Sequence, residues 1–348
     1  MILVTGATGF VGRRLVQRLI ADGYPIRRAV RRADGVLGET VAVGEIGPDT
    51  DWSQALAGVD TVVHLAGRAH VLRHEADALA SFRRVNAAGT GRLAAQAEQA
   101  GVRRFVLISS VKAAAESTIR YLSIEGREPA PDPVRGRPEG LGEGAGAGSA
   151  ETSTEGFKVL REIDPPDPRT PYGISKLEGE QALYAAAQRM ETVVLRPPLV
   201  YGPEVRANFR ALLRLVYSGV PIPLGSVRNR RSIIALDNLV AAIVTSLNAV
   251  GATGGTFYVA DGPALSTPAL IRGLATALGK PARLFPFPPS LLAAAAAVLG
   301  RGEQAESLLG SLVVDDAAFR AATGWRPPLD HAASFLQVAS WFKRGRKS

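Results

Sequence analysis

Short apolar runs alternate with longer segments rich in Ala, Leu and Arg over the first 110 residues. The short runs have the length and β-branched content of buried strands, and the longer segments have the length of helices. This alternation is typical of repeated βαβ units, so we predict an α/β, doubly wound parallel sheet. The strands predicted on this basis are Ile2–Thr5, Ile26–Val30, Thr40–Val43, Thr61–Leu65 and Arg104–Ser109.

The pattern changes after Ser110. Residues 117–168 are dense in Gly, Pro, Glu and Ser, which predicts a long flexible insertion. Helical spacing returns at Tyr172 and continues to about Arg189, and the apolar run Thr192–Leu195 predicts a further strand. After a proline turn, short helices and strands predict a smaller α/β lobe. We therefore expect one domain over residues 1–196 and a lobe over 197–348, part of which returns to the first domain.

The composition excludes several classes of protein. The chain has 348 residues, of which 46% are apolar and none is cysteine, so we expect a globular protein without disulfides or thiolate metal sites. His70 and His74 are one helical turn apart but have no third ligand at a matching spacing, so we expect no metal. The absence of cysteine is compatible with a reducing cytoplasm, which is the expected location.

Neither the N-terminus nor the apolar stretches predict a membrane segment. The N-terminal apolar run passes directly into glycines, which is typical of a strand rather than a signal peptide. The longest apolar stretch, Leu291–Leu299, is far shorter than the ~20 residues that span a bilayer. We interpret it as a buried or dimer-facing helix.

The chain carries 41 Lys and Arg against 32 Asp and Glu, a net charge of +9. The excess arginines are scattered, so this charge could attract nucleic acid, a phosphorylated cofactor or a diphosphate substrate. No nucleic-acid-binding motif is present, and we expect no nucleic-acid partner.

A glycine-rich turn follows the first predicted strand and opens a helix. Its sequence is Thr-Gly-Ala-Thr-Gly-Phe-Val-Gly, from Thr5 to Gly12. Glycines at this spacing permit a tight turn and close approach of the backbone to a pyrophosphate, which then faces the helix N-terminus. An ordinary βα turn is the alternative, but the position at the start of a βαβ unit favours a dinucleotide. The residues expected to bind it are Gly6, Thr8, Gly9, Phe10, Val11 and Gly12.

The end of the second strand bears on the choice between NAD and NADP. An acid at this point accepts the adenosine ribose hydroxyls and repels a 2′-phosphate. The chain has Arg31 and Arg32 here and no acid before Asp34. This favours NADP(H), with NAD(H) as the alternative if the two arginines are only a solvated strand end.

Tyr172 and Lys176 have the i, i+4 spacing that places both side chains on one face of a helix. A tyrosine has an unperturbed pKa near 10, and a neighbouring ammonium and a positively charged nicotinamide would bring it toward working pH. The Ser109-Ser110 pair ends a predicted strand, where a hydroxyl could hydrogen bond a substrate oxygen. Together these residues predict an acid–base centre.

Six motifs carry a resemblance to a known family. They are Val4–Gly12, Val63–Gly67, Arg84–Asn86, Leu107–Ser110, Pro171–Lys176 and Leu195–Pro203. The chain resembles the extended short-chain dehydrogenases/reductases, in the branch of UDP-galactose 4-epimerase and UDP-4-keto-sugar reductases. The resemblance implies a Rossmann domain with a nucleotide-sugar lobe, and it covers the chain apart from the insertion.

The resemblance also implies roles for individual residues. Tyr172 would be the acid–base group, Lys176 would hold the nicotinamide ribose, and Ser110 would bind the substrate. Further cofactor contacts would come from Glu45, Ile46, Leu65, Ala66, Gly67, Asn86, Ser109 and Pro198. In the lobe, Asn208 and Arg231 would bind the diphosphate, and the block from Pro221 to Leu224 would seat the uracil. A homodimer is expected, with the Ala-rich segments near 91–100 and 185–188 as candidate contacts.

The chain departs from the family at three points. Ser110-Val111 stands where dehydratases carry acidic residues, so sugar 4,6-dehydration is not expected. Ala113–Ala115 replaces the common Val-Tyr-Gly, and a second phosphate-binding arginine before Val313 is missing.

Three functions remain open. The arginines after strand two and the Ser-Ser-Val-Lys segment, which resembles reductases of 6-deoxy-amino-sugar nucleotides, slightly favour NADPH-dependent reduction of a UDP-4-keto sugar. The family at large favours a UDP-sugar 4-epimerase, acting on a UDP-hexose or UDP-N-acetylhexosamine. A non-catalytic NADP-binding module is the third alternative, although such modules usually lose Tyr or Lys.

Overall fold

The computed structural model describes residues 1–32, 39–69, 77–118, 157–300 and 302–345. Asp34, His70, His74 and most of the predicted insertion lie outside these residues. Seven parallel strands form the main sheet in the order β10-β7-β5-β4-β1-β2-β3. Their bounds are β1 (Ile2–Thr5), β2 (Ile26–Val30), β3 (Glu39–Ala42), β4 (Thr61–His64), β5 (Arg104–Ile108), β7 (Glu191–Arg196) and β10 (Gly255–Tyr258).

The predicted doubly wound α/β fold is confirmed. Each strand predicted from the sequence forms, and no end differs by more than one residue. The apolar runs of β1, β4 and β5 are buried on both faces, whereas the edge strand β3 has no buried residue. β1 lies between β4 and β2, with Ile2 opposite Ile26 of β2 and Thr61 of β4.

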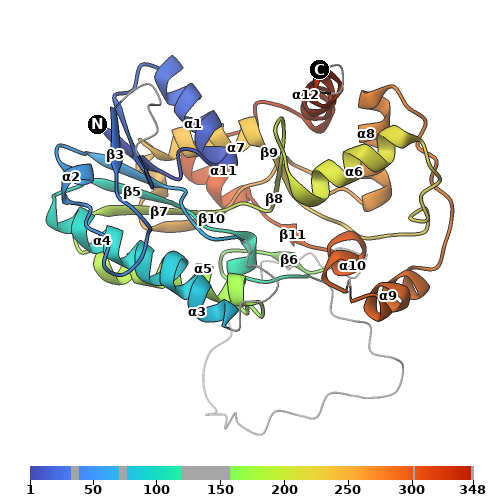
Figure 1. Cartoon of the computed structure of the whole chain (residues 1–348), viewed down its shortest axis with the longest axis horizontal. Coiled ribbons are helices and arrows are strands. Elements are labelled where there is room, and N and C mark those ends of the chain that lie inside the picture. Colours follow the sequence, from blue (N-terminus) through green and yellow to red (C-terminus); the bar gives the residue numbers. More distant parts are fainter. Residues whose placement is uncertain (33–38, 70–76, 119–156, 301, 346–348) are drawn as a thin grey trace, which may run out of the picture.

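Helices cover both faces of the sheet (Figure 1). Side chains alternate along each strand, so Leu3 and Phe105 pack toward α2, α4 and α5, whereas Val4 and Val106 pack toward α1, α7 and α11. The bounds of these helices are α1 (Phe10–Ala21), α2 (Ser53–Leu56), α4 (Gly89–Gln99), α5 (Pro171–Ala186), α7 (Leu236–Ser246) and α11 (Ala317–Thr323). α3 (Ala78–Arg83) continues into α4 through a π-helical turn at Arg84–Ala88.

A second apolar core holds the smaller lobe together. It contains Tyr201, Phe209, Ile271 and Phe335, with the Tyr201 and Phe209 rings stacked at 5.4 Å. The elements around it are β8 (Leu199–Tyr201), β9 (Ile233–Ala235), α6 (Ala207–Ser218), α8 (Thr267–Leu278) and α12 (His331–Arg344). A short pair, β6 (Val159–Leu160) and β11 (Val313–Val314), joins the lobe to the chain that precedes α5.

The chain returns from the lobe to the sheet twice. β10 extends the sheet beside β7, and α11 packs on the same face as α1. Trp325, interpreted from the sequence as a packing anchor, is buried at 5.5 Å from the Phe319 ring. The division of the chain at residue 196 stays a prediction.

A helix forms at the apolar stretch near residue 291, but one interpretation of it is wrong. α9 (Pro289–Val298) has no buried residue, so it is not a buried helix. The lobe core is closed by α6, α8 and α12, and only Leu292 of α9 packs against it. α10 (Gly302–Leu309) follows directly. Among the described helices, none is both long and apolar enough to cross a membrane.

The contact between α5 and the π-helical turn leaves no room for a side chain at Gly179. A Cβ built there would lie 2.2 Å from the Asn86 carbonyl oxygen. We expect Gly179→Ala to lower the free energy of unfolding by about 1–3 kcal/mol, because the two backbones must separate. Urea unfolding measures this change. Gly302→Ala, in open space, is the matched control, and equal stability of the two variants would contradict the prediction.

Candidate active site

The predicted site residues gather at the carboxyl ends of the central strands. The glycine-rich turn follows β1, Leu65–Gly67 follows β4, and Ser109-Ser110 follows β5. Parallel α/β sheets bind ligands at this edge. The lobe stands on the same side of the sheet (Figure 1).

The glycine-rich turn has the shape of a phosphate cradle. Gly6 has φ +66°, and a Cβ there would lie 2.7 Å from the Ala66 backbone nitrogen. A Cβ on Gly12 would lie 2.1 Å from the Gly6 carbonyl oxygen, so the helix can start this close only with glycine. Gly9 caps α1 without a side-chain hydrogen bond, which leaves N–H groups of the first turn free for a pyrophosphate. These residues fit a bound dinucleotide.

The residues expected around the adenosine lie beside this turn. Arg31 forms an ion pair with Glu45 at 3.5 Å, and both side chains are mostly exposed. Arg32 is also exposed, whereas Ile46 packs against the core under α4. The two arginines are therefore accessible to a phosphate.

Local contacts fix the start of α5 and thereby the place of Tyr172. Thr170 caps the helix by accepting a hydrogen bond from the Gly173 N–H, and Pro171 occupies the first turn. The Glu116 carboxylate accepts hydrogen bonds from the Thr170 N–H at 2.9 Å and from its hydroxyl at 2.7 Å. The Tyr172 ring packs edge-on against Phe82.

The structure brings Tyr172 and Ser110 together. Burial raises the pKa of Tyr172, and a hydrogen bond with the Ser110 hydroxyl opposes that shift. Ser110 is held in extended backbone and accepts a hydrogen bond from the Lys112 N–H, which turns the chain away from the sheet after β5. The Ser110 hydroxyl therefore remains at the strand end beside the phenol.

Lys176 lies one helical turn beyond Tyr172, and its amino group donates a hydrogen bond to the Ile108 carbonyl at 2.9 Å. Burial lowers the pKa of Lys176 to about 8, and the Glu180 carboxylate opposes the shift. Near neutral pH the ammonium form still dominates. A positive charge is thus kept on the same face of α5 as Tyr172.

A buried ion pair, not singled out from the sequence, lies one further turn along α5. Arg196 of β7 donates hydrogen bonds to both carboxylate oxygens of Glu180, at 3.1 and 2.6 Å. The Ser109 hydroxyl also donates to Glu180, and Tyr258 stacks under the guanidinium. The sequence carries a signal for Glu180 alone, because it follows Lys176 by four residues and so shares its helix face.

His64 is a second buried group that sequence reasoning missed. Its ring bonds to the Thr5 hydroxyl at 2.7 Å and to the Thr90 hydroxyl at 3.1 Å. Burial lowers its pKa to about 3, with a smaller contribution from the charge of Lys176. The imidazole is therefore neutral, and it ties β1, β4 and α4 together beneath the cofactor edge.

Two predicted cofactor residues have their side chains engaged by the protein itself. Asn86 accepts a hydrogen bond from the Arg68 N–H and donates to the Arg68 carbonyl and to Ser175. Ser109 is bound to Glu180, as described above. Leu65 and Ala66 are partly exposed, Gly67 is exposed, and Pro198 is buried just after β7.

The predicted substrate residues occupy different environments in the lobe. Asn208 is exposed in the first turn of α6, Pro221 is exposed, and Leu224 is buried in the lobe core. Arg231 is largely enclosed, donates a hydrogen bond to the Gly310 carbonyl at 3.0 Å, and has its pKa lowered by burial. Within the described chain, none of these four side chains hydrogen bonds to Tyr172, Lys176 or Ser110.

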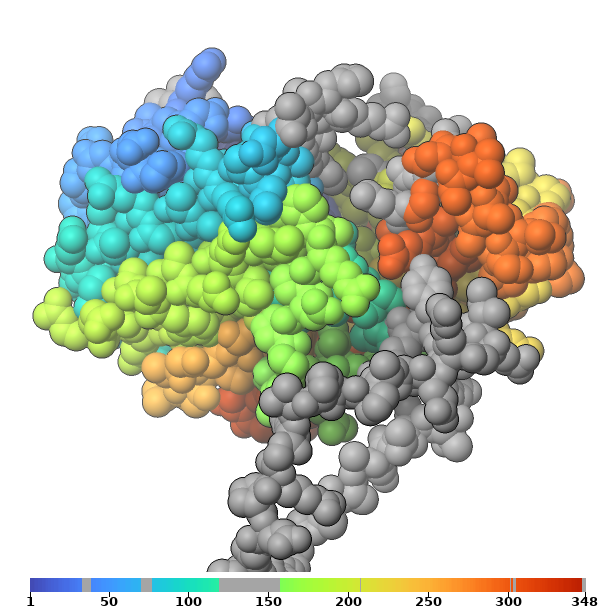
Figure 2. All heavy atoms as spheres, turned by 90° about the horizontal axis from the view of Figure 1, so that it is seen from below, coloured from blue at the N-terminus to red at the C-terminus, as the bar shows by residue number. Residues whose placement is uncertain are grey.

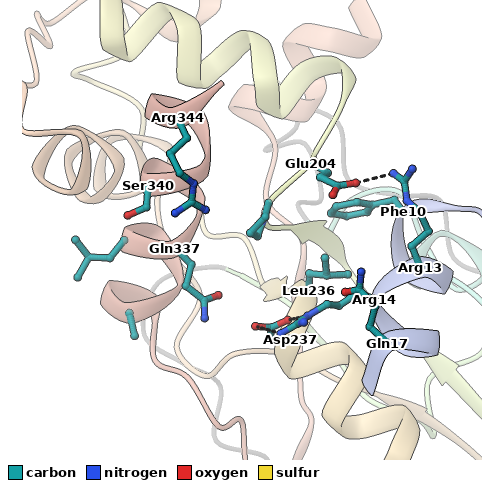
Figure 3. A pocket seen from close by; sticks show the side chains of 13 residues that line it. Phe10, Arg13, Arg14, Gln17, Glu204, Leu236, Asp237, Gln337, Ser340 and Arg344 are labelled. Atoms are coloured by element: carbon teal, nitrogen blue, oxygen red, sulfur yellow. Dashed lines mark hydrogen bonds and ion pairs between the residues drawn. The ribbon is translucent and has the colours of Figure 1, made fainter. Parts of the chain in front are cut away.

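A groove of about 530 Å³ lies between α1, α7 and α12 (Figure 3). Its floor includes Phe10, and two ion pairs cross its walls, Arg13 with Glu204 at 2.7 Å and Arg14 with Asp237 at 2.6 Å. Neither Tyr172 nor Lys176 lines it. The described residues also contain no group of three or more potential metal ligands.

A family model for the NAD dependent epimerase/dehydratase family matches residues 2–134 and 146–260. The chain belongs to this family. It is 38% identical over 350 residues to a UDP-glucose 4-epimerase from Vibrio cholerae, covering 98% of this chain and 95% of the relative. It is 27% identical over 298 residues to the N-acetyl-alpha-D-glucosaminyl-diphospho-ditrans,octacis-undecaprenol 4-epimerase of Escherichia coli O157:H7, covering 84% of this chain and 77% of that one.

Solved structures show the same fold. The UDP-glucuronic acid 4-epimerase from Bacillus cereus, in complex with NAD, superposes with a TM-score of 0.70 at 18% identity, covering 99% of this chain and 97% of that one. The resemblance to extended short-chain dehydrogenases/reductases, predicted from the sequence motifs, is thus confirmed.

The buried Glu180–Arg196 pair should support the stability of the whole site. We expect Glu180→Gln to lower the free energy of unfolding by about 3 kcal/mol, because it leaves the Arg196 charge buried without its counter-ion. Chemical denaturation measures the change. The matched control is Glu178→Gln, also on α5, which removes a partly exposed ion pair with Arg83 of α3. This variant should leave the denaturation midpoint unchanged. Similar loss in both variants would refute the role of the buried pair.

Proposed function

We propose that this protein interconverts the C4 epimers of a UDP-hexose or UDP-N-acetylhexosamine by reversible hydride transfer at C4. The observation that carries the proposal is the convergence of the buried Tyr172 phenol with the Ser110 hydroxyl at the end of β5, with the buried Lys176 ammonium one helical turn away. The similarity to a UDP-glucose 4-epimerase along 98% of the chain supports epimerisation as the net reaction.

The chain's own groups supply the proton chemistry. Tyr172, as phenolate, accepts the proton of the C4 hydroxyl while hydride leaves C4, and the Ser110 hydroxyl holds the same oxygen. Lys176 stabilises the phenolate by its charge. NAD(P), held at the glycine-rich turn of Gly6, Gly9 and Gly12, would supply the hydride acceptor for the first half-reaction and the hydride donor for the second. Tyr172 gives the proton back to the ketone oxygen after the keto sugar has turned in the pocket, so no net oxidation occurs.

Reduction of a UDP-4-keto sugar by NADPH is the second candidate. Arg31 and Arg32 favour it, because their exposed guanidinium groups could bind a 2′-phosphate. The proton path would be the same, with Tyr172 protonating the oxygen and the oxidised cofactor leaving.

A homodimer through the Ala-rich parts of α4 and α5 also remains a prediction.

One experiment separates these candidates. The purified protein is assayed for released nucleotide, for conversion between UDP-glucose and UDP-galactose or their N-acetyl forms, and for NADPH oxidation with a UDP-4-keto-6-deoxy-amino sugar. Epimer conversion without net cofactor oxidation supports the proposal. Stoichiometric NADPH consumption without epimer conversion would replace it with the reductase.

Tyr172→Phe tests whether the protein is an enzyme at all. The substitution removes the phenol oxygen but keeps the ring against Phe82, so we expect kcat to fall roughly 10²- to 10⁴-fold while nucleotide affinity is retained. Stopped-flow or steady-state turnover and nucleotide titration measure the two quantities. Unchanged turnover would exclude Tyr172 as the acid–base group, and absence of turnover in both forms would favour a binding module.

The pH dependence should report the titration of Lys176. The pKa of its amino group is about 8, so the ammonium that stabilises the phenolate is lost as pH rises through this value. We expect kcat/KM to decline above about pH 8. In Glu180→Gln the decline of kcat/KM should begin at lower pH, because the Glu180 carboxylate raises the pKa of Lys176. Glu178→Gln is the control. A decline that begins at the same pH in Glu180→Gln as in the unchanged protein would show that it does not report the titration of Lys176.

A further inference from the structure

The groove between α1, α7 and α12 lies apart from the catalytic residues. Figure 1 shows α1 and α12 on the upper side of the molecule, whereas α4 and α5 lie on its lower side, which faces the viewer in Figure 2. Tyr172 and Ser110 do not line the groove, and neither do Asn208 and Arg231 of the lobe. Of the residues expected to contact the cofactor, Phe10 alone lines it within the described chain. A ligand in the groove is therefore separate from the cofactor and the sugar nucleotide.

The groove spans the junction of the two apolar cores. The Phe10 ring packs against both the core of the sheet and the core of the lobe. α1 and α7 line the groove from the side of the sheet, and α12 lines it together with Pro203 and Glu204 (Figure 3). Its volume of about 530 Å³ is typical of small-molecule sites. The groove therefore suits a small molecule that contacts both parts of the protein.

Hydrogen-bond donors dominate the polar lining of the groove. Apart from two carboxylates, the polar side chains that line it are Arg13, Arg14, Gln17, Gln337, Ser340 and Arg344. The last three follow one another at spacings of three and four residues, so they share one exposed face of α12. Two helices thus present donors across the same space.

Both carboxylates of the lining are already paired with arginines. Asp237 accepts hydrogen bonds from Arg14 at 2.6 and 3.2 Å, and a carboxylate oxygen of Glu204 lies 2.7 Å from an Arg13 nitrogen. The Arg344 guanidinium has no hydrogen bond or ion pair with another described residue. Three guanidinium groups and two carboxylates line the groove, so it keeps an excess of positive charge.

Glu204 is held in an unfavourable backbone conformation at the edge of the groove. Its φ is 66°, the one positive value among the non-glycine residues that the structure describes. A residue with a side chain adopts this conformation at a cost in energy, and such residues cluster at ligand sites. The ion pair with Arg13 is thus made by a residue that the surrounding structure must hold in place.

These features select the chemistry of the occupant. Guanidinium groups bind phosphate oxygens through parallel hydrogen bonds, and the excess positive charge disfavours a cation. Phe10 and Leu336 offer apolar surface in the same groove. We propose that the groove is a second ligand site, for a small phosphate ester of the size of a nucleoside monophosphate. Arg344 and Arg14 bind its phosphate, and its apolar part lies against Phe10.

The test is isothermal titration calorimetry of the full chain with AMP and with adenosine. NAD and UDP are first added at saturation, so that the cofactor and substrate sites are filled. We expect AMP to bind and adenosine to bind at least about tenfold more weakly, because it lacks the phosphate.

Two groove variants should change AMP affinity in opposite directions. Arg344→Gln should weaken binding about tenfold, because it removes the unpaired guanidinium. Asp237→Asn should strengthen binding, because it removes a negative charge and releases Arg14 for the phosphate. The matched controls are Arg326→Gln, at an exposed arginine outside the groove, and Asp22→Asn, which removes the partner of another arginine on α1.

Thermal unfolding of all four variants verifies that each remains folded. Opposite changes in the two groove variants, with the controls unchanged, support the proposal. Similar changes in the controls would show a response to net charge alone and overturn it. Absence of AMP binding would also overturn it, as would AMP binding that Arg344→Gln leaves unchanged. Arg344 is exposed at the end of α12, so Arg344→Gln decides the matter even if Asp237→Asn is unstable.

Discussion

The buried pair of Glu180 and Arg196 is the contact on which the site depends. Glu180 belongs to α5, Arg196 ends β7, and the Ser109 hydroxyl brings the end of β5 to the same carboxylate. The pair therefore joins the helix that carries Tyr172 and Lys176 to the two strands beneath it. Because a carboxylate inside the protein requires a counter-ion and hydrogen bonds, helix and strands have one favourable arrangement relative to each other.

Two further buried contacts extend this arrangement toward the cofactor edge. His64 links the ends of β1 and β4 to α4, and Asn86 links the chain after β4 to Ser175 on α5. The polar side-chain atoms of both residues hydrogen bond to other groups of the protein. The glycine-rich turn and the acid–base residues are thus built on one connected set of hydrogen bonds, which limits independent movement of cofactor and phenol.

The sequence predicted six of the seven strands of the main sheet, because their apolar runs and the glycine-rich turn were recognisable. It did not predict β10, which reaches the sheet edge only after the chain has returned from the lobe. It also predicted that Tyr172, Lys176 and Ser110 would meet, since a helix face and a strand end were recognisable. The Glu180–Arg196 pair was not predicted, because its partners are sixteen residues apart and meet only through tertiary packing. The burial of α9 was wrongly expected for the same reason, as local pattern does not reveal which faces of a lobe are already closed.

The hydrogen bonds between Glu116 and Thr170 have a consequence for the chain that connects them. They fasten the chain that follows β5 to the start of α5, and the Thr118 N–H is held separately by the Ser311 carbonyl. Both anchors belong to described residues, so the position of Tyr172 is fixed by contacts on either side of residues 119–156. A change in the number of residues between Thr118 and Phe157 would add a loop-closure entropy that grows only slowly with length, and it would leave these contacts with Thr170 intact.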